Sequence, residues 1–249
     1  MPQINLKIVV PSYNCEKWIS KCLSSIETQT FKDFDVCIID DKSDVDKQRE
    51  IIQKFCEKNN WKYIFNAERK FALFNIRLGI EHICHDDNDV IILVDGDDWL
   101  YDNDVFDKIN KLYSEKDIYM SYGQYIRSET KSTSKYFAFK PSDEIVEKKL
   151  YRRVPWMFTH LKTFKYGLFK KIREKHFIDI GGKYFRTTYD LAIMFPIVEM
   201  AGKKFECVND ILYVYNEDNP ISDYKAHRAE QARVDGLIRS FPVYPTMTI

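Results

Sequence analysis

The sequence lacks several signals that would assign it to a class at once. Its six cysteines form no Cys-x-x-Cys pair, and neither a Gly-x-Gly-x-x-Gly motif nor a Walker phosphate loop occurs. No stretch reaches the roughly 18 apolar residues that a membrane span requires. These absences argue against a zinc site, a disulfide framework, a membrane-spanning helix and a glycine cradle for phosphates. The cysteines are expected to be reduced and mostly buried.

The chain also lacks an excess of charge of either sign. Lys and Arg together number 38, as do Asp and Glu, in a sequence that is 45% hydrophobic and 31% charged. Such a composition predicts a soluble globular protein with no overall field that recruits nucleic acid or an anionic membrane. Because the first residues lack the layout of a signal peptide, we expect a cytoplasmic protein and leave peripheral membrane association open.

Carboxylates are concentrated where one apolar run stops. Val90–Val94 is aliphatic without a break, which predicts a strand buried on both faces, and Asp95, Asp97 and Asp98 follow it directly. Carboxylates this close repel one another unless a cation holds them, which points to a hard divalent metal. Asp-Gly is also a common turn dipeptide, and Asp98 could cap a helix beginning near Asp102. From these residues alone, both interpretations stand.

Strand and helix patterns alternate through the first half of the chain. Strands are predicted at 4–10, 34–39, 61–65 and 90–94, with helices following the first three, the third of them at 71–83. This alternation is typical of a parallel sheet with helices on both faces. Right-handed crossovers bring the ends of the first, second and fourth strands to one crevice, lined by Pro11 to Tyr13, Asp40-Asp41 and Asp95 to Asp98. A nucleotide is the usual occupant of such a crevice.

The second half is less regular. The sequence predicts an amphipathic helix at 105–113, a strand at 118–126 and a polar loop at 127–135 that could act as a lid. It further predicts a buried helix after Thr187 or Thr188, two strands at 203–208 and 211–215, and a final helix at 227–239. The segment 152–175 interleaves aromatic and basic residues. It is either a site for an anionic acceptor or for the leaving diphosphate, or an amphipathic helix that buries its aromatics.

Four segments together carry a family resemblance: Val9-Val10-Pro11-Ser12-Tyr13-Asn14, residues 25–34, Ile38-Ile39-Asp40-Asp41-Lys42-Ser43 and Leu93-Val94-Asp95-Gly96-Asp97-Asp98. Over about the first hundred residues, the chain resembles the family 2 glycosyltransferases of the GT-A fold. The resemblance implies a single α/β domain with a Rossmann-like, mostly parallel central sheet, helices on both faces and a mixed acceptor-side subregion. Residues 1–126 would bind the nucleotide sugar, 127–224 would form the acceptor-binding and catalytic half, and 225–249 would form a C-terminal helix and tail.

The resemblance also implies roles for residues of the nucleotide site. Pro11 and Tyr13 would border the base, Asp41 would contact a uracil-like ring, Asp95 the ribose, and Asp97 a divalent metal, Mn²⁺ or Mg²⁺. Lys70 stands where the family often has a base or phosphate contact, although a lysine at a helix end is more often only solvated. Related enzymes place a further histidine ligand near residues 216–223. Since no histidine occurs there, Glu217 or Asp218 could substitute, with surface turn residues as the equal alternative for both.

On the acceptor side, the family opens the helix near residue 189 with an acidic pair that supplies the catalytic base. Tyr189 replaces the first acid here, so Asp190 alone matches the base. An acid in a first turn also favours the helix dipole without any other role. Trp156 and His160 are candidate acceptor-side residues, and a satisfied core histidine is the alternative for His160.

The resemblance therefore implies inverting, metal-assisted transfer of a sugar from a nucleoside diphosphate sugar, UDP-linked by expectation, to a hydroxyl of a glycan or lipid-linked acceptor. A retaining GT-A transferase and a sugar-nucleotide-binding module without transfer activity are the alternatives. A nucleotidyltransferase is disfavoured because Pro11-Ser12-Tyr13-Asn14 is not a glycine-rich phosphate loop. The neutral net charge disfavours a nucleic acid acceptor.

Overall fold

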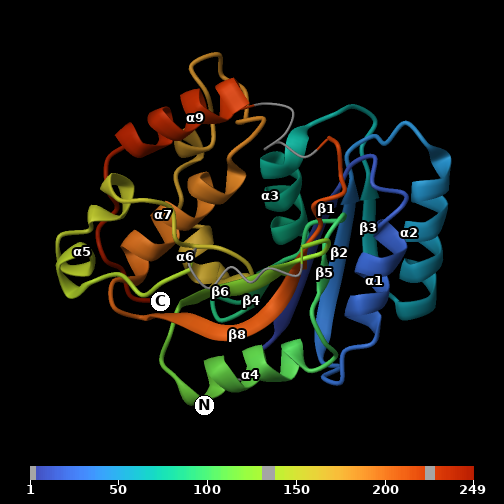
Figure 1. The fold of residues 1–249 in the computed structure, drawn as a ribbon, viewed down its shortest axis with the longest axis horizontal. Coiled ribbons are helices and arrows are strands. Elements are labelled where there is room, and N and C mark those ends of the chain that lie inside the picture. The colour runs from blue at the N-terminus through green and yellow to red at the C-terminus, as the bar shows by residue number, and fades with distance from the viewer. Residues whose placement is uncertain (1–3, 131–137, 222–227) are drawn as a thin grey trace.

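The computed structural model describes residues 4–130, 138–221 and 228–249. One eight-stranded mixed sheet, in the order β3-β2-β1-β4-β7-β6-β8-β5, runs through the molecule (Figure 1). Its strands are β1 (Leu6–Ser12), β2 (Phe34–Asp40), β3 (Lys62–Phe65), β4 (Val90–Leu93), β5 (Trp99–Leu100), β6 (Met120–Arg127), β7 (Lys162–Lys165) and β8 (Phe205–Tyr215). The helices are α1 (Ile19–Glu27), α2 (Asp46–Asn59), α3 (Phe71–Ile83), α4 (Val105–Glu115), α5 (Asp143–Glu147), α6 (Tyr166–Phe169), α7 (Tyr189–Ala201) and α9 (Arg228–Ser240), with short 3₁₀ turns η1 (Leu150–Arg153) and η2 (Glu174–His176).

The first half forms the parallel part of the sheet. β3, β2, β1 and β4 pair in parallel register, and every residue of β1 is buried. Successive side chains of a strand point to opposite faces: Val9 joins the core under α3 and α7, whereas Ile8 and Val10 join the core under α1, α2 and α4. Helices thus cover both faces of the sheet, as predicted, and α3 occupies the predicted residues.

The second half completes the sheet with mixed pairing. β7 is antiparallel to both β4 and β6, β6 is parallel to β8, and the two-residue β5 pairs antiparallel with β8. Figure 1 shows β8 as a long, curved strand below the centre of the molecule. Its register against β6 shifts at Gly123/Gln124 and Gln124/Tyr125, and such irregularities bend a strand. The mixed subregion predicted for the second half is therefore part of the same sheet.

Several local predictions were wrong. The two strands expected at 203–208 and 211–215 are the single strand β8, since the polar residues between them sit in the irregular part of its pairing with β6. The segment 152–175 is no amphipathic helix. It contains β7 and α6 and parts of η1 and η2, and its middle is extended because β7 pairs with both β4 and β6. β5 is too short to leave a pattern in the sequence.

The cysteines are free, and all but the partly buried Cys207 are buried, as predicted. In the described parts of the chain, no helix combines the length and the apolarity that crossing a bilayer demands. The loop predicted at 127–135 lies outside the described residues from residue 131 onward, as does His227, the first residue of the predicted final helix.

Candidate active site

A cavity of about 750 Å³ lies at the carboxyl ends of β1, β2 and β4, where parallel strands bind ligands. The start of α7 and one side of α9 form its opposite wall. Eight of the nine residues selected from the sequence line it: Pro11, Tyr13, Asp41, Asp95, Asp97, Trp156, His160 and Asp190. Lys70 is not among the lining residues. The crevice predicted from the strand ends is therefore present.

Arg69 takes the place expected for Lys70. Its guanidinium carbon lies 3.8 Å from the ring centroid of Tyr13 and 4.7 Å from that of Phe71, and all three residues line the cavity. The Lys70 side chain instead pairs with Glu68, which is exposed. A planar guanidinium stacked on an aromatic ring is a well-ordered cation. Arg186 lines the same end of the cavity, with its guanidinium carbon 5.1 Å from the ring centroid of Phe71, so Arg69 and Arg186 both offer a cation to a ligand there.

Asp41 holds the beginning of α3. Its Oδ1 accepts hydrogen bonds from the backbone N–H of Lys70 at 2.7 Å and from Asn66 Nδ2 at 3.0 Å, and its Oδ2 accepts one from the N–H of Phe71 at 2.8 Å. The first N–H groups of a helix lack partners within the helix, and a carboxylate satisfies them. Asp41 is 3% exposed. It therefore fixes the cavity wall, whatever else it contacts.

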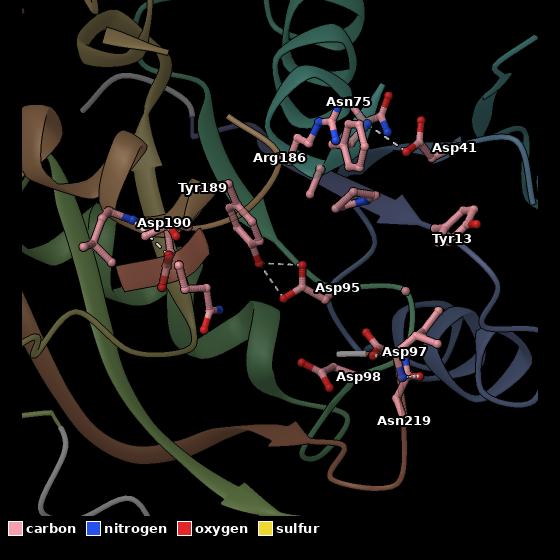
Figure 2. A pocket seen from close by; sticks show the side chains of 18 of the residues that line it. Tyr13, Asp41, Asn75, Asp95, Asp97, Asp98, Arg186, Tyr189, Asp190 and Asn219 are labelled. Carbon is pink, nitrogen blue, oxygen red and sulfur yellow. Dashed lines mark hydrogen bonds between the residues drawn. The ribbon is translucent and has the colours of Figure 1, made fainter. Parts of the chain in front are cut away.

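Tyr189 and Asp95 are in direct contact within the cavity (Figure 2). The Tyr189 hydroxyl lies 2.6 Å from both carboxylate oxygens of Asp95. Burial raises the pKa of Asp95, and the charge of Asp190 adds to this, while Lys162 and the hydrogen bond from Tyr189 act in the opposite direction. The residue that departs from the family pattern thus engages the predicted ribose ligand directly. This contact could not be predicted from local patterns, because it joins residues 94 positions apart.

Asp97 and Asp98 meet the loop after β8. Asp97 Oδ2 accepts a hydrogen bond from Asn219 Nδ2 at 2.7 Å, and Asp98 Oδ1 accepts one from the backbone N–H of Asn216 at 2.8 Å. Figure 2 shows Asn219 beside Asp97. Asp98 does not cap α4, whose N-cap position is Asp104, so that interpretation was wrong. Glu217 pairs with Arg127 instead, and neither Glu217 nor Asp218 lines the cavity.

The acidic end of the cavity fits a divalent cation. Oxygens of Asp95 and Asp98 and a ring nitrogen of His160 lie within 4.8 Å of one another. Asp98 Oδ2 and His160 Nδ1 are buried and have no hydrogen-bond partner among the described residues. Burial raises the pKa of Asp98 well above its ordinary value, with the charges of Asp97 and Asp95 adding to the effect. A cation between such ligands removes both the repulsion and the unsatisfied polar atoms.

His160 and Trp156 also line the cavity, His160 next to the acidic end. The His160 ring stacks on Tyr213 at 4.4 Å between centroids, and Trp156 packs edge-on against Phe158 and Phe195, each at 5.4 Å. Burial lowers the pKa of His160 well below its ordinary value, and the charge of Lys162 lowers it further. His160 is therefore neutral, the form in which an imidazole binds a metal.

Asp190 occupies the first turn of α7, as predicted, with Thr188 at the N-cap position. Its Oδ1 accepts a hydrogen bond from the N–H of Leu191 at 3.0 Å, and no other hydrogen bond to this carboxylate comes from the described parts of the chain. A carboxylate held by one oxygen at a helix N-terminus is oriented and still able to accept a proton.

The cavity wall supplied by α9 was not predicted. Arg228, Gln231, Ala232, Asp235 and Arg239 line it. Arg239 donates to the backbone oxygens of Arg152 at 3.0 Å and Val154 at 2.9 Å, which ties α9 to the segment before Trp156. The polar side chains recur on one side of the predicted helix, but only the tertiary structure shows that this side faces the site.

Solved structures share the architecture of this chain. S. aureus TarS 1–349 in complex with UDP-GlcNAc aligns with a TM-score of 0.72 at 17% identity, over 94% of this chain and 65% of that one. Mannosyltransferase PcManGT from Pyrobaculum calidifontis, in complex with GDP-Man and Mn²⁺, aligns with a TM-score of 0.61 at 16% identity, over 96% of this chain and 65% of that one. The fold is therefore the GT-A fold, and the chain spans about two thirds of these structures.

The sequence defines the family within this fold class. The model of glycosyl transferase family 2 matches residues 7–180, and the chain belongs to that family. Glycosyltransferase GlyG of Streptococcus pneumoniae serotype 4 is 26% identical over 217 residues, which are 84% of this chain and 70% of GlyG. Chondroitin synthase of Escherichia coli is 36% identical over 59 residues, 24% of this chain and 9% of that protein. The predicted family and fold are confirmed, and the protein is a glycosyltransferase.

Proposed function

We propose that this protein transfers a sugar from a nucleoside diphosphate sugar to an acceptor hydroxyl with inversion at the anomeric carbon. The observation that carries this proposal is the single cavity that joins the strand-end residues Tyr13, Asp41 and Asp95 to Asp190 on the opposite wall. Donor and acceptor can then meet between the two walls, as a displacement in one step requires. Residues 1–126 form the donor half, residues 127–224 the acceptor half, and residues 225–249 the C-terminal helix and tail.

The donor nucleotide lies across the ends of β2, β1 and β4. Pro11 and Tyr13 border its base, with Arg69 stacked on Tyr13. Asp95 faces the ribose, and one of its carboxylate oxygens becomes available to the ribose when the Tyr189 hydroxyl bonds only the other. A uracil base near Asp41 is consistent with the structural similarity to TarS in complex with UDP-GlcNAc. We therefore propose a UDP-linked donor.

Asp97 is the proposed ligand of a divalent cation, Mn²⁺ or Mg²⁺. Asp95, Asp98 and His160 line the same cavity, and their own ligand atoms, without Asp97, lie within 4.8 Å of one another. When bound, such a cation neutralises the charge that develops on the departing diphosphate. The structural similarity to a mannosyltransferase complex that contains Mn²⁺ supports this cofactor.

Asp190 is the proposed general base. Its carboxylate accepts the proton of the acceptor hydroxyl while the acceptor oxygen forms a bond to the anomeric carbon from the face opposite the diphosphate. The bond between the anomeric carbon and the diphosphate oxygen breaks, and the nucleoside diphosphate leaves with the bonding electrons. Trp156 and His160 line the side from which a glycan or lipid-linked acceptor would enter.

The metal assignment is tested by titrating UDP into the protein with and without Mn²⁺. We expect Mn²⁺ to tighten UDP binding by about tenfold or more, since a cation shared between carboxylates and diphosphate contributes more than about 1.4 kcal/mol. In Asp97→Asn this gain should disappear, because one anionic ligand is lost. Asp104→Asn, which alters an exposed carboxylate just before α4, is the matched control. An Asp97→Asn protein that keeps the full Mn²⁺ effect contradicts the assignment.

A further inference from the structure

Lys162 is an ammonium group buried in the wall of the cavity. It is 2% exposed, yet it lines the cavity at the start of β7. Its Nζ lies 3.4 Å from His160 Nε2 and 5.3 Å from the ring centroid of Tyr189. Lysines are almost never buried this far unless they are paired with an anion, because desolvation of the charge costs several kcal/mol.

No carboxylate in the described parts of the chain forms an ion pair with Lys162. The charge of Lys162 does act on Asp95, because it counteracts the rise that burial causes in the pKa of Asp95. Both oxygens of Asp95, however, already accept from the Tyr189 hydroxyl. His160 is neutral and offers a lone pair but no charge. The ammonium therefore faces the cavity without an anion in contact.

The position of Lys162 follows from the sheet. The order β2-β1-β4-β7 places β7 next to β4, and Lys162 is the register partner of Leu93, two residues before Asp95. Adjacent strands lie about 4.8 Å apart. A nucleotide whose base lies over β2 and β1 and whose ribose lies at Asp95 directs its next group toward β7. In a nucleoside diphosphate, that group is the diphosphate.

We propose that Lys162 is a fixed cationic subsite for the diphosphate of the donor nucleotide, which gives this chain a share of its nucleotide affinity that needs no metal. The proposal rests on the proposed function, because it takes a nucleoside diphosphate as the ligand. The ammonium lies 3.4 Å from His160 Nε2 and over the ring of Tyr189, so its position is defined before the ligand arrives. The same charge opposes the repulsion between the diphosphate and the carboxylates of Asp95, Asp97 and Asp98.

The test compares UDP with uridine, both titrated in EDTA. The ratio of the two affinities isolates the contribution of the diphosphate. We expect the unaltered protein to bind UDP more tightly than uridine without metal, and Lys162→Met to weaken UDP binding by about tenfold or more while changing uridine binding by less than about twofold. Lys165→Met removes a lysine from the same strand that bonds Asn88 outside the cavity, and it should leave both affinities unchanged.

A second neutral variant, Lys162→Gln, keeps a donor for His160 and covers the case in which Lys162→Met does not fold. Equal UDP affinity of the Lys162 variants and the unaltered protein in EDTA overturns the proposal. So does a parallel loss of UDP and uridine affinity, which would show that Lys162 only supports the fold. If the protein binds UDP only when Mn²⁺ is present, the proposal for Lys162 is overturned and the proposed function stands. A chain that binds no nucleoside diphosphate even with Mn²⁺ loses both.

Discussion

Asp190→Asn is expected to lower the rate of sugar transfer by about 10²–10⁴-fold, the contribution typical of a positioned general base. The amide cannot accept the proton of the acceptor hydroxyl, so the nucleophile must form without assistance. UDP affinity should stay within about twofold of that of the unaltered protein, because Asp190 lies at the start of α7, on the wall opposite the strand ends. Transfer is measured as the release of UDP from a panel of UDP-sugars in the presence of acceptor, and binding by calorimetry.

Asp143→Asn is the matched control for this prediction. Asp143 is also an acid in the first turn of a helix, α5, and it does not line the cavity. If the role of Asp190 were only to favour the helix dipole, both substitutions would have small effects of similar size. Near-normal transfer by Asp190→Asn would show that the base is another group.

Arg152→Met is expected to destabilise the protein by about 3–5 kcal/mol, which is the usual cost of leaving one member of a buried ion pair without its partner. Arg152 Nε and Nη2 donate to the two oxygens of Glu199 at 2.5 and 3.0 Å, and both side chains are almost inaccessible. Arg152 Nη1 also donates to the backbone oxygen of Ile238 at 2.5 Å, and Glu199 accepts from the N–H of Tyr244 at 3.0 Å. The pair therefore ties α7 to α9 and to the C-terminal tail.

The double variant Arg152→Met/Glu199→Met separates the ion pair from packing. It removes both charges, so it should lose less stability than Arg152→Met alone, although the hydrogen bonds to Ile238 and Tyr244 are lost too. Unfolding in urea gives the free energies of unfolding. Domains are stable by only about 5–15 kcal/mol, so such a loss is a large part of the total. Because Arg152 also holds α9, the single variant should weaken the attachment of the cavity wall that α9 forms. A loss below about 1 kcal/mol for Arg152→Met would contradict this account.

The first half of the fold could be predicted because its strands and helices follow from the pattern of apolar residues that are close in the sequence. The run Val90–Val94 and the periodicity of residues 71–83 identify β4 and α3 without reference to the rest of the chain. β7 could not be identified in this way. Its four residues, Lys162–Lys165, mix charged and aromatic side chains, and it becomes a strand because β4 and β6 pair with its two edges.

The same distinction applies to the site. The strand-end acids could be selected because each follows a recognisable strand, and Asp190 could be selected because it matches an acid with which the family opens a helix. The contacts of Tyr189 with Asp95 and of Asn219 with Asp97 could not, since they join residues 94 and 122 positions apart. Arg69 and Lys70 show the limit most plainly: the two adjacent basic residues directly precede α3, and only packing against Tyr13 decides which one faces the cavity.

The measurement that tests the central claim most directly is the thermal unfolding of the unaltered protein with a panel of nucleotides and sugar nucleotides, with and without Mn²⁺. A ligand at a hundred times its dissociation constant adds about 2.7 kcal/mol, which raises the midpoint of a chain of this size by about 5–10 °C. We predict such a rise for UDP and a UDP-sugar with Mn²⁺, a smaller rise in EDTA, and the smallest rise for uridine at the same concentration. Failure of every nucleoside diphosphate to raise the midpoint in the presence of Mn²⁺ would contradict the assignment of this cavity to a sugar-nucleotide donor.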